Sequence, residues 1–287
     1  METNASRDQF NRQAALYATS PVHRSGPSLP VLVEVAAPKP VDLVLDVATG
    51  TGNTALALAP FVLRVIGLDV ASGMLDQARA RAQAENVENV EFITGSAEDL
   101  PFPDAEFSLV VSRHAPHHFH DLDKFLREVG RVLKPGGRFV VADQISPSAQ
   151  VADWVDRWER TRDPSHFRQR TLNEWRQVSA VAGFSWIRDQ AVPYELPFDW
   201  WVKQAGCEEE TVHELQKQAS AADEVVRREM GIEFNPAGQV VSFLEPMMVA
   251  LLERGRKTQR AQDLVWPFGC FAPVLSRVVS WLSKSGL

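Results

Sequence analysis

The segment Val44-Leu45-Asp46-Val47-Ala48-Thr49-Gly50-Thr51-Gly52-Asn53-Thr54-Ala55 decides the fold of this 287-residue chain. It starts as an apolar strand, continues as a turn of small residues and ends at the start of a helix. Gly50 and Gly52 lack a Cβ, so the backbone of the turn can approach a ligand closely and adopt φ values that other residues avoid. The segment therefore predicts a strand, a turn and a helix that hold a nucleotide-like ligand.

A second acidic residue lies where such a site needs one. Asp69 ends the next apolar run, 23 residues after Asp46. A carboxylate at that place can accept hydrogen bonds from both hydroxyls of a ribose. The glycine pattern alone does not identify the ligand, because Gly50-x-Gly52-x-x-Ala55 suits a nicotinamide or flavin nucleotide as well as S-adenosylmethionine (SAM).

Short apolar runs alternate with longer amphipathic stretches between residues 42 and 143. This alternation is typical of β-α-β units around a parallel sheet, and so predicts an α/β fold. The apolar runs are mostly too short for helices, whereas two stretches carry apolar residues at helical spacing and Pro135-Gly136-Gly137 stops the second. The predicted strands are 43–47, 65–69, 90–93, 107–112 and 138–143, and the predicted helices are 73–86 and 122–133.

Four motifs discriminate between these ligands by their order and spacing. They are Asp46 four residues before Gly50, Asp69 followed by Ser72-Gly73-Met74-Leu75, the segment 95–102 (GSAEDLPF) and the turn 133–137 (LKPGG). The chain resembles the class I SAM-dependent methyltransferases, in particular the small-molecule branch with the UbiE-like enzymes (methyltransferase type 11), over residues 10–253. The resemblance implies a Rossmann-like, mostly parallel seven-stranded sheet with helices on both faces, plus a helical lid and a C-terminal tail.

The resemblance also implies how the cofactor, SAM, is held over the carboxyl ends of the first, second and fourth strands. Asp69 would hold the ribose, Ala97 and Glu98 would flank the adenine, and Met74 would pack near the nucleoside. The other cofactor-binding residues that it implies are Asp46, Ala48, Gly50, Gly52, Arg113 and His114.

The loop after the fourth predicted strand, residues 112–121, contains four histidines. His117 or His118 could act as a general base, since imidazole titrates near neutral pH and can take a proton from a substrate hydroxyl or acidic carbon. The alternative is that these rings only hydrogen-bond the loop and shape the pocket. We expect no metal, because no set of carboxylates or cysteines completes a first coordination shell.

The pattern, together with the resemblance, leads us to expect three parts of the chain. Residues 1–40 form an N-terminal helical cap, in which Tyr17 would touch the methionine end of SAM; alternatively, Phe10, Ala14 and Tyr17 are a helix face that packs on the sheet. Residues 41–253 form the SAM-binding domain, with a lid insertion at about 193–237. Residues 254–287 form a basic, amphipathic tail.

The second half of the chain is rich in tryptophan and charge. The indole rings either pack between helices or line an apolar pocket. We predict a strand at 183–189, one charged helix at 208–230, and a final strand or hairpin from 240–244 and 247–252 that closes the sheet.

Composition limits the partners and the compartment. The formal net charge of −7 argues against electrostatic binding of nucleic acid over a large surface, because such binding needs clustered Lys and Arg side chains. The two cysteines fit no disulfide framework, and Met1 to Gln13 contains no apolar signal segment, so we expect a cytoplasmic protein. No apolar run is long enough to span a bilayer. The C-terminal tail either docks on its own domain, caps the pocket, lies on a membrane surface or contacts a partner. The sequence also allows a homodimer.

Together these observations predict a SAM-dependent methyltransferase that acts on O or C of a small, apolar or aromatic molecule. Two alternatives remain. One is a SAM-binding module, or a SAM-dependent enzyme that transfers no methyl group, because a fold does not guarantee its usual chemistry. The other is an NAD-dependent oxidoreductase, which the glycine pattern also allows.

Overall fold

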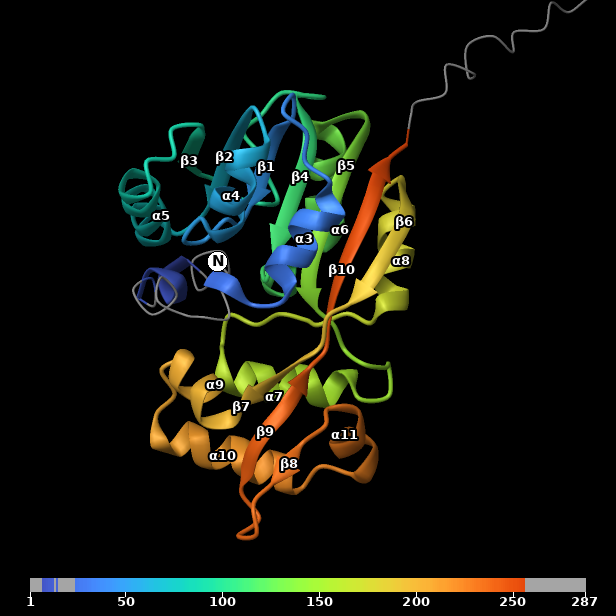
Figure 1. Cartoon of the computed structure of the whole chain (residues 1–287). Helices are drawn as coiled ribbons and strands as arrows, with labels where there is room; N and C mark the ends of the chain where they lie inside the picture. The colour runs from blue at the N-terminus through green and yellow to red at the C-terminus, as the bar shows by residue number, and fades with distance from the viewer. Residues whose placement is uncertain (1–6, 13, 15–23, 256–287) are drawn as a thin grey trace, which may run out of the picture. The chain divides into compact units, whose positions relative to one another are not determined.

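The computed structural model describes residues 7–12, 14 and 24–255 (Figure 1). Its main sheet has seven strands in the order β3-β2-β1-β4-β5-β10-β6. Strands β1 to β5 pair in parallel, and β10 is antiparallel to both of its neighbours. This confirms the predicted α/β fold with a mostly parallel seven-stranded sheet. The strands are β1 (Leu43–Val47), β2 (Arg64–Asp69), β3 (Val90–Thr94), β4 (Phe107–Arg113), β5 (Leu133–Gln144), β6 (Phe184–Ala191) and β10 (Met247–Arg254).

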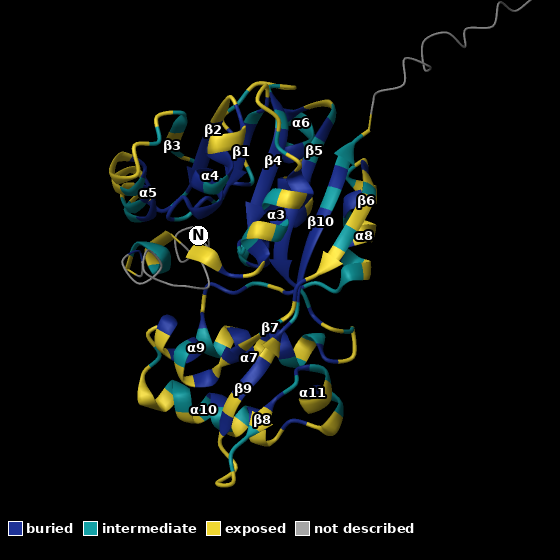
Figure 2. Cartoon of the chain, in the orientation of Figure 1, coloured by how far each residue is buried: buried dark blue, intermediate teal, exposed yellow. Residues whose placement is uncertain are grey.

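Helices cover both faces of this sheet, and alternate strand residues feed two separate cores. Val44 of β1 packs in a core with α3 and α4, whereas its neighbour Leu45 packs in a second core with α6 and α8. Figure 2 shows the resulting buried strands between half-exposed helices. Successive side chains of a strand point to opposite faces of the sheet, so both faces of this sheet are packed in apolar surroundings, as is usual for a parallel sheet. The helices are α3 (Ser28–Ala36), α4 (Asn53–Leu58), α5 (Ser72–Ala84), α6 (Leu122–Val132) and α8 (Leu172–Val181), with the short 3-10 turns η1 (Ala59–Phe61) and η2 (Pro116–His118).

A smaller helical subdomain adjoins the sheet. It contains α7 (Ala152–Arg162), α9 (Phe198–Gln204), α10 (Glu209–Ser220) and α11 (Glu224–Glu229), and a three-stranded sheet in the order β7-β9-β8. Trp158, Trp201 and Phe243 share its core and are almost fully buried. Two elements outside the expected lid range of 193–237, α7 and β9, pack in this same core, and the expected domain boundaries stay a prediction. The small strands are β7 (Tyr194–Pro197), β8 (Glu233–Phe234) and β9 (Val240–Glu245).

Two predictions for this region need correction. The single helix expected at 208–230 is two helices, because the Asp223 side chain accepts a hydrogen bond from the backbone N–H of Val226 and caps α11. Of the two alternatives for residues 240–252, the hairpin is wrong, whereas a strand at 247–252 that joins the main sheet is confirmed as part of β10. Pro246 separates β9, in the small sheet, from β10, which lies between β5 and β6 in the main sheet.

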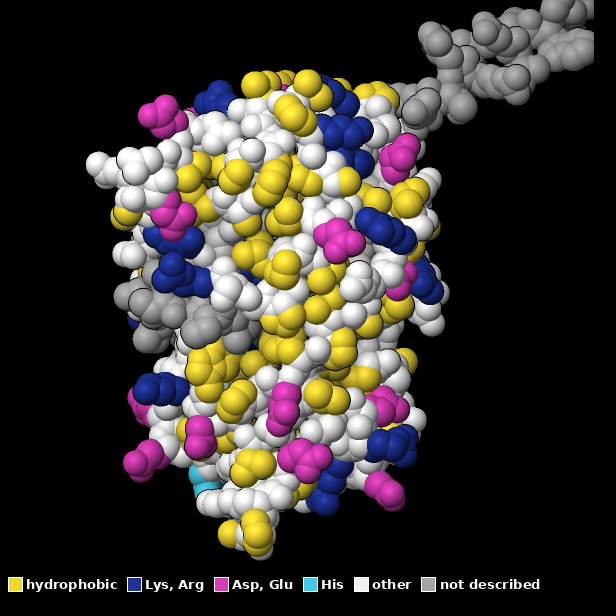
Figure 3. Space-filling model, in the orientation of Figure 1, with side chains coloured by type: hydrophobic (Ala, Val, Ile, Leu, Met, Phe, Trp, Pro, Cys, Tyr) yellow, Lys and Arg dark blue, Asp and Glu magenta, His cyan; other side chains and the backbone are white. Residues whose placement is uncertain are grey.

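The tail, apart from residues 254 and 255, lies outside the described residues, as does Tyr17. No helix among the described residues is long and apolar enough to cross a membrane. On the face shown in Figure 3, acidic and basic side chains are interspersed.

Candidate functional site

A cleft with an empty volume of about 1040 Å³ lies at the carboxyl ends of the parallel strands. Loops that follow β1, β2, β3 and β4 all contribute to it, which is the place where open α/β sheets bind ligands. Of the residues predicted from the sequence, the following line this cofactor cleft: Ala48, Gly50, Asp69, Met74, Ala97, Glu98, Arg113, His114 and His118.

The loop after β1 has an unusual backbone. Ala48, Gly50 and Gly52 all have φ between 55° and 78°, in the left-handed region. A Cβ built on Gly50 would meet no atom within 4 Å, whereas one built on Gly52 would lie 3.0 Å from both Ala78 Cβ and Phe92 Cζ. Gly50 thus presents bare backbone to the cleft, and Gly52 instead allows close packing of α4's start against α5 and β3.

Asp69 is fixed at the end of β2 by two backbone donors. Its Oδ2 accepts a hydrogen bond from Gly50 N at 2.8 Å, and its Oδ1 accepts one from Ala71 N at 2.9 Å. Burial raises the pKa of this carboxyl, and these backbone donors act in the opposite direction. Because a carboxylate offers about four lone-pair positions, acceptor capacity remains for a hydroxyl donor in the cleft.

Asp46 lies behind the cleft wall. It is buried, and its Oδ2 accepts a hydrogen bond from Thr49 Oγ1 at 2.6 Å, which closes the turn after β1. Burial raises its pKa to about 7, and the charge of Arg113 opposes that rise. Asp46 thus accepts a hydrogen bond within the loop and does not line the cleft, and Gly52 does not line it either.

Arg113 and His114 tie the end of β4 to the N-terminal helix α3. Arg113 donates to Ser28 Oγ at 3.2 Å and to Thr54 Oγ1 at 3.3 Å, and His114 Nε2 lies 3.2 Å from the same Ser28 hydroxyl. Burial lowers the pKa of Arg113 only to about 10, so it stays charged at neutral pH. A positive φ of 53° at His114 turns the chain sharply into the loop that follows.

The described part of the N-terminal segment covers one end of the cleft. Phe10 lines it, and Ala14 packs with Ala71 and Met74. Asn11 Oδ1 accepts a hydrogen bond from Gly73 N at 2.9 Å, which satisfies a free donor in the first turn of α5. Phe10 thus fits the expected cap, and Ala14 fits the alternative of a packed helix face.

Glu98 borders the cleft at the loop after β3. Its Oε1 accepts a hydrogen bond from Asp121 N at 3.0 Å, and its own N–H donates to Ser96 Oγ at 3.2 Å. The loops after β3 and β4 are therefore joined next to Ala97.

The two histidines proposed as bases lie in different settings. His118 lines the cofactor cleft and a second cavity, whereas His117 lines the second cavity alone. His117 Nδ1 lies 2.7 Å from Asp143 Oδ1, and His118 Nδ1 lies 3.0 Å from the carbonyl oxygen of Ser165. Burial lowers the pKa of His117 well below its usual value and that of His118 to about 3, so burial disfavours the charged form of both rings.

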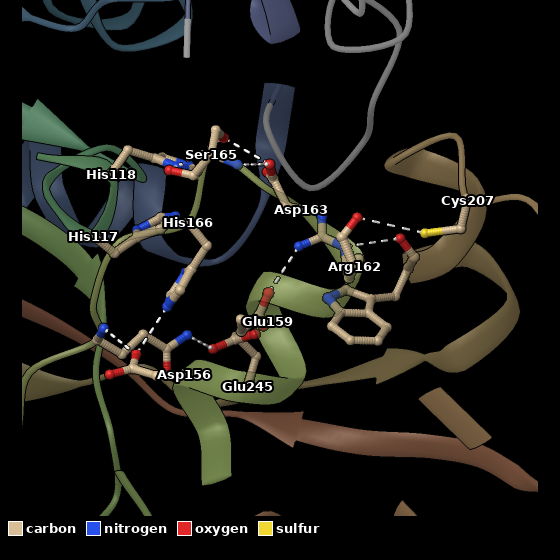
Figure 4. Close-up of polar contacts among 12 residues, drawn as sticks. His117, His118, Asp156, Glu159, Arg162, Asp163, Ser165, His166, Cys207 and Glu245 are labelled. Carbon is tan, nitrogen blue, oxygen red and sulfur yellow. Dashed lines mark hydrogen bonds and ion pairs between the residues drawn. The ribbon is translucent and has the colours of Figure 1, made fainter. Parts of the chain in front are cut away.

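This second cavity, which we call the polar chamber, has an empty volume of about 530 Å³. Figure 4 shows several of its residues, which come from α7, the loop after it and the segment after β4. His114 and His118 line both cavities, so the chamber adjoins the cofactor cleft directly. The lining residues are His114, His117, His118, Gln144, Glu159, Arg162, Asp163, His166, Tyr194, Leu196, Trp200 and Trp201.

Sequence reasoning missed most of the polar chamber. Asp143 ends a predicted strand, a signal that resembles that of Asp69, but its partner His117 lies 26 residues earlier in the chain. Glu159 and Asp163 occur in a charged stretch with no motif. Among the described residues, no group of three or more His, Cys, Asp or Glu side chains could hold a metal ion.

Comparisons with known proteins agree with this geometry. Residues 45–141 match the family described as "Methyltransferase domain". The uncharacterized methyltransferase YcgJ of Bacillus subtilis (strain 168) is 35% identical over 249 residues, which cover 86% of this chain and 97% of YcgJ. The crystal structure of YcgJ superposes with a TM-score of 0.75 over 79% of this chain and 98% of that chain. A demethylmenaquinone methyltransferase of Thermus thermophilus is 44% identical over 114 residues, 39% of this chain and 51% of that enzyme. The chain belongs to the class I small-molecule methyltransferases.

Proposed function

We propose that the protein transfers the methyl group of SAM to a small molecule, with SAM in the cofactor cleft and the acceptor beside it. The observation that carries this proposal is the pairing of Gly50 and Asp69 across the carboxyl ends of β1 and β2. Backbone free of Cβ and a fixed carboxylate with spare acceptor capacity suit the ribose and methionine parts of SAM.

The other predicted cofactor residues take supporting parts in this proposal. Met74 and Ala97 supply apolar surface for the nucleoside, and Glu98 orders the loop beside it. Arg113 and His114 lie at the end of β4, where the methionine part would approach the polar chamber. Asp46 and Gly52 act on the loop from behind, through Thr49 and through packing.

Bound SAM supplies an electrophilic methyl group on a sulfonium ion. The protein's own contribution is to align the acceptor with that methyl group and to exclude water, since alignment alone can lower the barrier by several kcal/mol, roughly 7 to 11 in the best cases. The two cavities share His114 and His118 in their walls, which allows the two reactants to meet.

Calorimetry with purified protein tests this function. We expect SAM and its demethylated product S-adenosylhomocysteine to bind at micromolar concentrations and NADH not to bind. Gly50→Arg should abolish binding because the side chain fills the cleft. Gly238→Arg is the matched control, because Gly238 also has a positive φ and open space around it but does not line the cleft. NADH binding without SAM binding would identify an oxidoreductase instead, and SAM binding with no methyl transfer to any acceptor would favour a binding module.

A further inference from the structure

The polar chamber is not the apolar pocket that the tryptophan-rich sequence suggests. Leu196 is the one aliphatic residue among those that line it. Two carboxylates, Glu159 and Asp163, are 3% and 2% exposed. Glu159 forms an ion pair with Arg162 at 3.0 Å, and Asp163 accepts hydrogen bonds from the N–H and the hydroxyl of Ser165. Ion pairs and hydrogen bonds thus hold the carboxylates in a buried wall, and a ligand in the chamber must satisfy polar groups.

The chamber walls carry both acceptors and donors of hydrogen bonds, among them the carboxylates of Glu159 and Asp163 and the indole N–H of Trp201, which has no hydrogen-bond partner among the described residues. Carboxylates only accept, and a neutral imidazole offers one acceptor nitrogen. Burial disfavours charge on both His117 and His118. A ligand that both donates and accepts hydrogen bonds therefore fits these walls, and a hydroxyl group does both.

Four histidines line the chamber, and the three that Figure 4 draws, His117, His118 and His166, have different hydrogen-bond partners. His117 is held by Asp143, and His166 Nε2 lies 2.9 Å from Asp156 Oδ1. Among the described residues, His118 forms its hydrogen bonds with the backbone carbonyl and the hydroxyl of Ser165, and the Asp163 carboxylate acts on its pKa through charge without a hydrogen bond to the ring. A carboxylate partner stabilises the imidazolium that a base becomes, and a carbonyl does so less well. This favours His117 or His166 over His118.

Position then separates His117 from His166. The rings of His117 and His118 are 4.1 Å apart, and His118 lines the cofactor cleft, whereas the ring of His166 lies 6.4 Å from that of His118. Among the described residues, the only hydrogen bond of the His117 ring is the one from Nδ1 to Asp143. Since Asp143 does not line the chamber, Nε2 is the ring nitrogen left for a ligand there.

We propose that the polar chamber binds an acceptor through an acidic hydroxyl group, and that Asp143 positions His117 so that its Nε2 takes the proton of that hydroxyl. This inference rests on the proposed function and names its substrate class. The hydroxyl O–H bond breaks, and the proton goes to Nε2. The oxygen would keep the electron pair of the O–H bond and use an electron pair to bond the methyl carbon of SAM. The bond from that carbon to sulfur would break, and its own electron pair would stay on sulfur as a neutral thioether.

The chemistry of the site indicates an aromatic hydroxyl. A base whose pKa is lowered by burial removes protons efficiently only from fairly acidic groups. A phenol, with a pKa of about 10 as in tyrosine, meets this condition. The rings of Trp200, Trp201 and Tyr194 line the same chamber and can pack against an aromatic ring.

Phenol and toluene, which have nearly the same shape, test the inference on the unmodified protein. Both are titrated at pH 9 into protein saturated with S-adenosylhomocysteine, while NMR follows the ring signals of ¹⁵N-labelled histidine. We expect His117 signals to shift on binding and phenol to bind at least fivefold more tightly than toluene. Equal affinities, or no shift of His117 with millimolar phenol, would overturn the proposal.

The same spectra report the proton positions of His117. Burial raises the pKa of Asp143 to about 8, so at pH 9 the carboxylate is ionised and should hold the proton on Nδ1. We expect Nε2 to be unprotonated in the free protein. A protonated Nε2 at that pH would exclude the proposed base.

Asp143→Asn tests the positioning role, and Asp156→Asn is the matched control because it alters the other buried His–Asp pair. The preference for phenol over toluene should fall at least threefold in the first variant and change less than twofold in the second. An unchanged preference in Asp143→Asn would refute the role of Asp143. If that variant does not fold, the measurements on the unmodified protein still decide the proposal. Binding of S-adenosylhomocysteine, measured on each sample, separates failure of this inference from failure of the proposed function.

Discussion

Replacing Gly50 with alanine separates the contribution of this glycine to folding from its contribution to the cofactor cleft. Gly50 has a φ of +55°, and a Cβ there meets no atom within 4 Å. The left-handed conformation costs an alanine roughly 1–2 kcal/mol. Alanine also has fewer conformations than glycine in the unfolded chain, and this favours folding by roughly 0.4–1 kcal/mol, which offsets part of the conformational cost. We therefore expect Gly50→Ala to lower the free energy of unfolding by only about 1 kcal/mol.

Binding should respond far more strongly than stability. The new methyl group projects into the cleft at the place where SAM's ribose and methionine would approach the backbone. A steric penalty of about 1.4 kcal/mol already weakens binding tenfold. We expect calorimetry to show at least a tenfold loss of affinity for S-adenosylhomocysteine.

Two other glycines provide the comparison. Gly238 has a φ of +79° and open space around it, so Gly238→Ala carries the same kind of backbone strain. It should lower the free energy of unfolding by the same amount as Gly50→Ala but bind S-adenosylhomocysteine with unchanged affinity. Gly52→Ala adds contacts at 3.0 Å with Ala78 and Phe92, and overpacking of this kind costs roughly 1–3 kcal/mol more. The reasoning fails if Gly50→Ala is the least stable of the three, or if it binds as tightly as Gly238→Ala.

Three further predictions concern charged and titrating groups. Asp69→Asn should weaken S-adenosylhomocysteine roughly tenfold to a hundredfold, because hydrogen bonds to a charged group contribute about 1.5–3 kcal/mol; unchanged affinity in calorimetry would contradict the ribose role. Asp46, with its pKa raised to about 7 by burial, destabilises the fold progressively as the pH rises from 4 to 7. From pH 5 to pH 8, the free energy of unfolding of Asp46→Asn should therefore rise by about 2 to 3 kcal/mol relative to that of the unmodified protein, as measured by urea unfolding. A fall relative to the unmodified protein over this pH range would contradict the prediction. His118, with its pKa lowered to about 3, should show no NMR titration between pH 8 and pH 5 in the folded protein, whereas it should titrate near 6.5 in urea.

The sequence predicted the sheet well because its signals are local. The run at 43–47 matches β1 in both bounds, and the Gly50 turn and Asp69 carry their meaning within a few residues. The charged surface at 208–230 has a weak periodicity and therefore predicts one helix, whereas the hydrogen bond from Val226 N to the Asp223 side chain begins a second helix within it. Local patterns thus located the strands and the cofactor cleft.

The polar chamber could not be predicted in this way. Its contacts join residues that are far apart in the sequence, such as His118 and Ser165, or His117 and Asp143. Each of these residues alone is compatible with an exposed loop or a solvated helix. Only the packing of α7 and its following loop against the end of β4 brings them together, and a single sequence does not specify that packing.

The end of β4 explains why one loop can serve both cavities. The turn at His114, with its positive φ, directs the chain between the cofactor cleft and the polar chamber, and His118 then lines both. His117 lies next to it but faces only the chamber, where Asp143 at the end of the neighbouring strand β5 holds its ring. Because β4 and β5 are paired in register up to Arg113 and Ala142, the sheet places the start of the loop that carries His117 beside Asp143, and the hydrogen bond between the two side chains then fixes the ring. The helices α7 and α9 and the strand β7 supply half of the residues that line the chamber, so under our proposal the identity of the acceptor should be sought in these elements rather than in the main sheet.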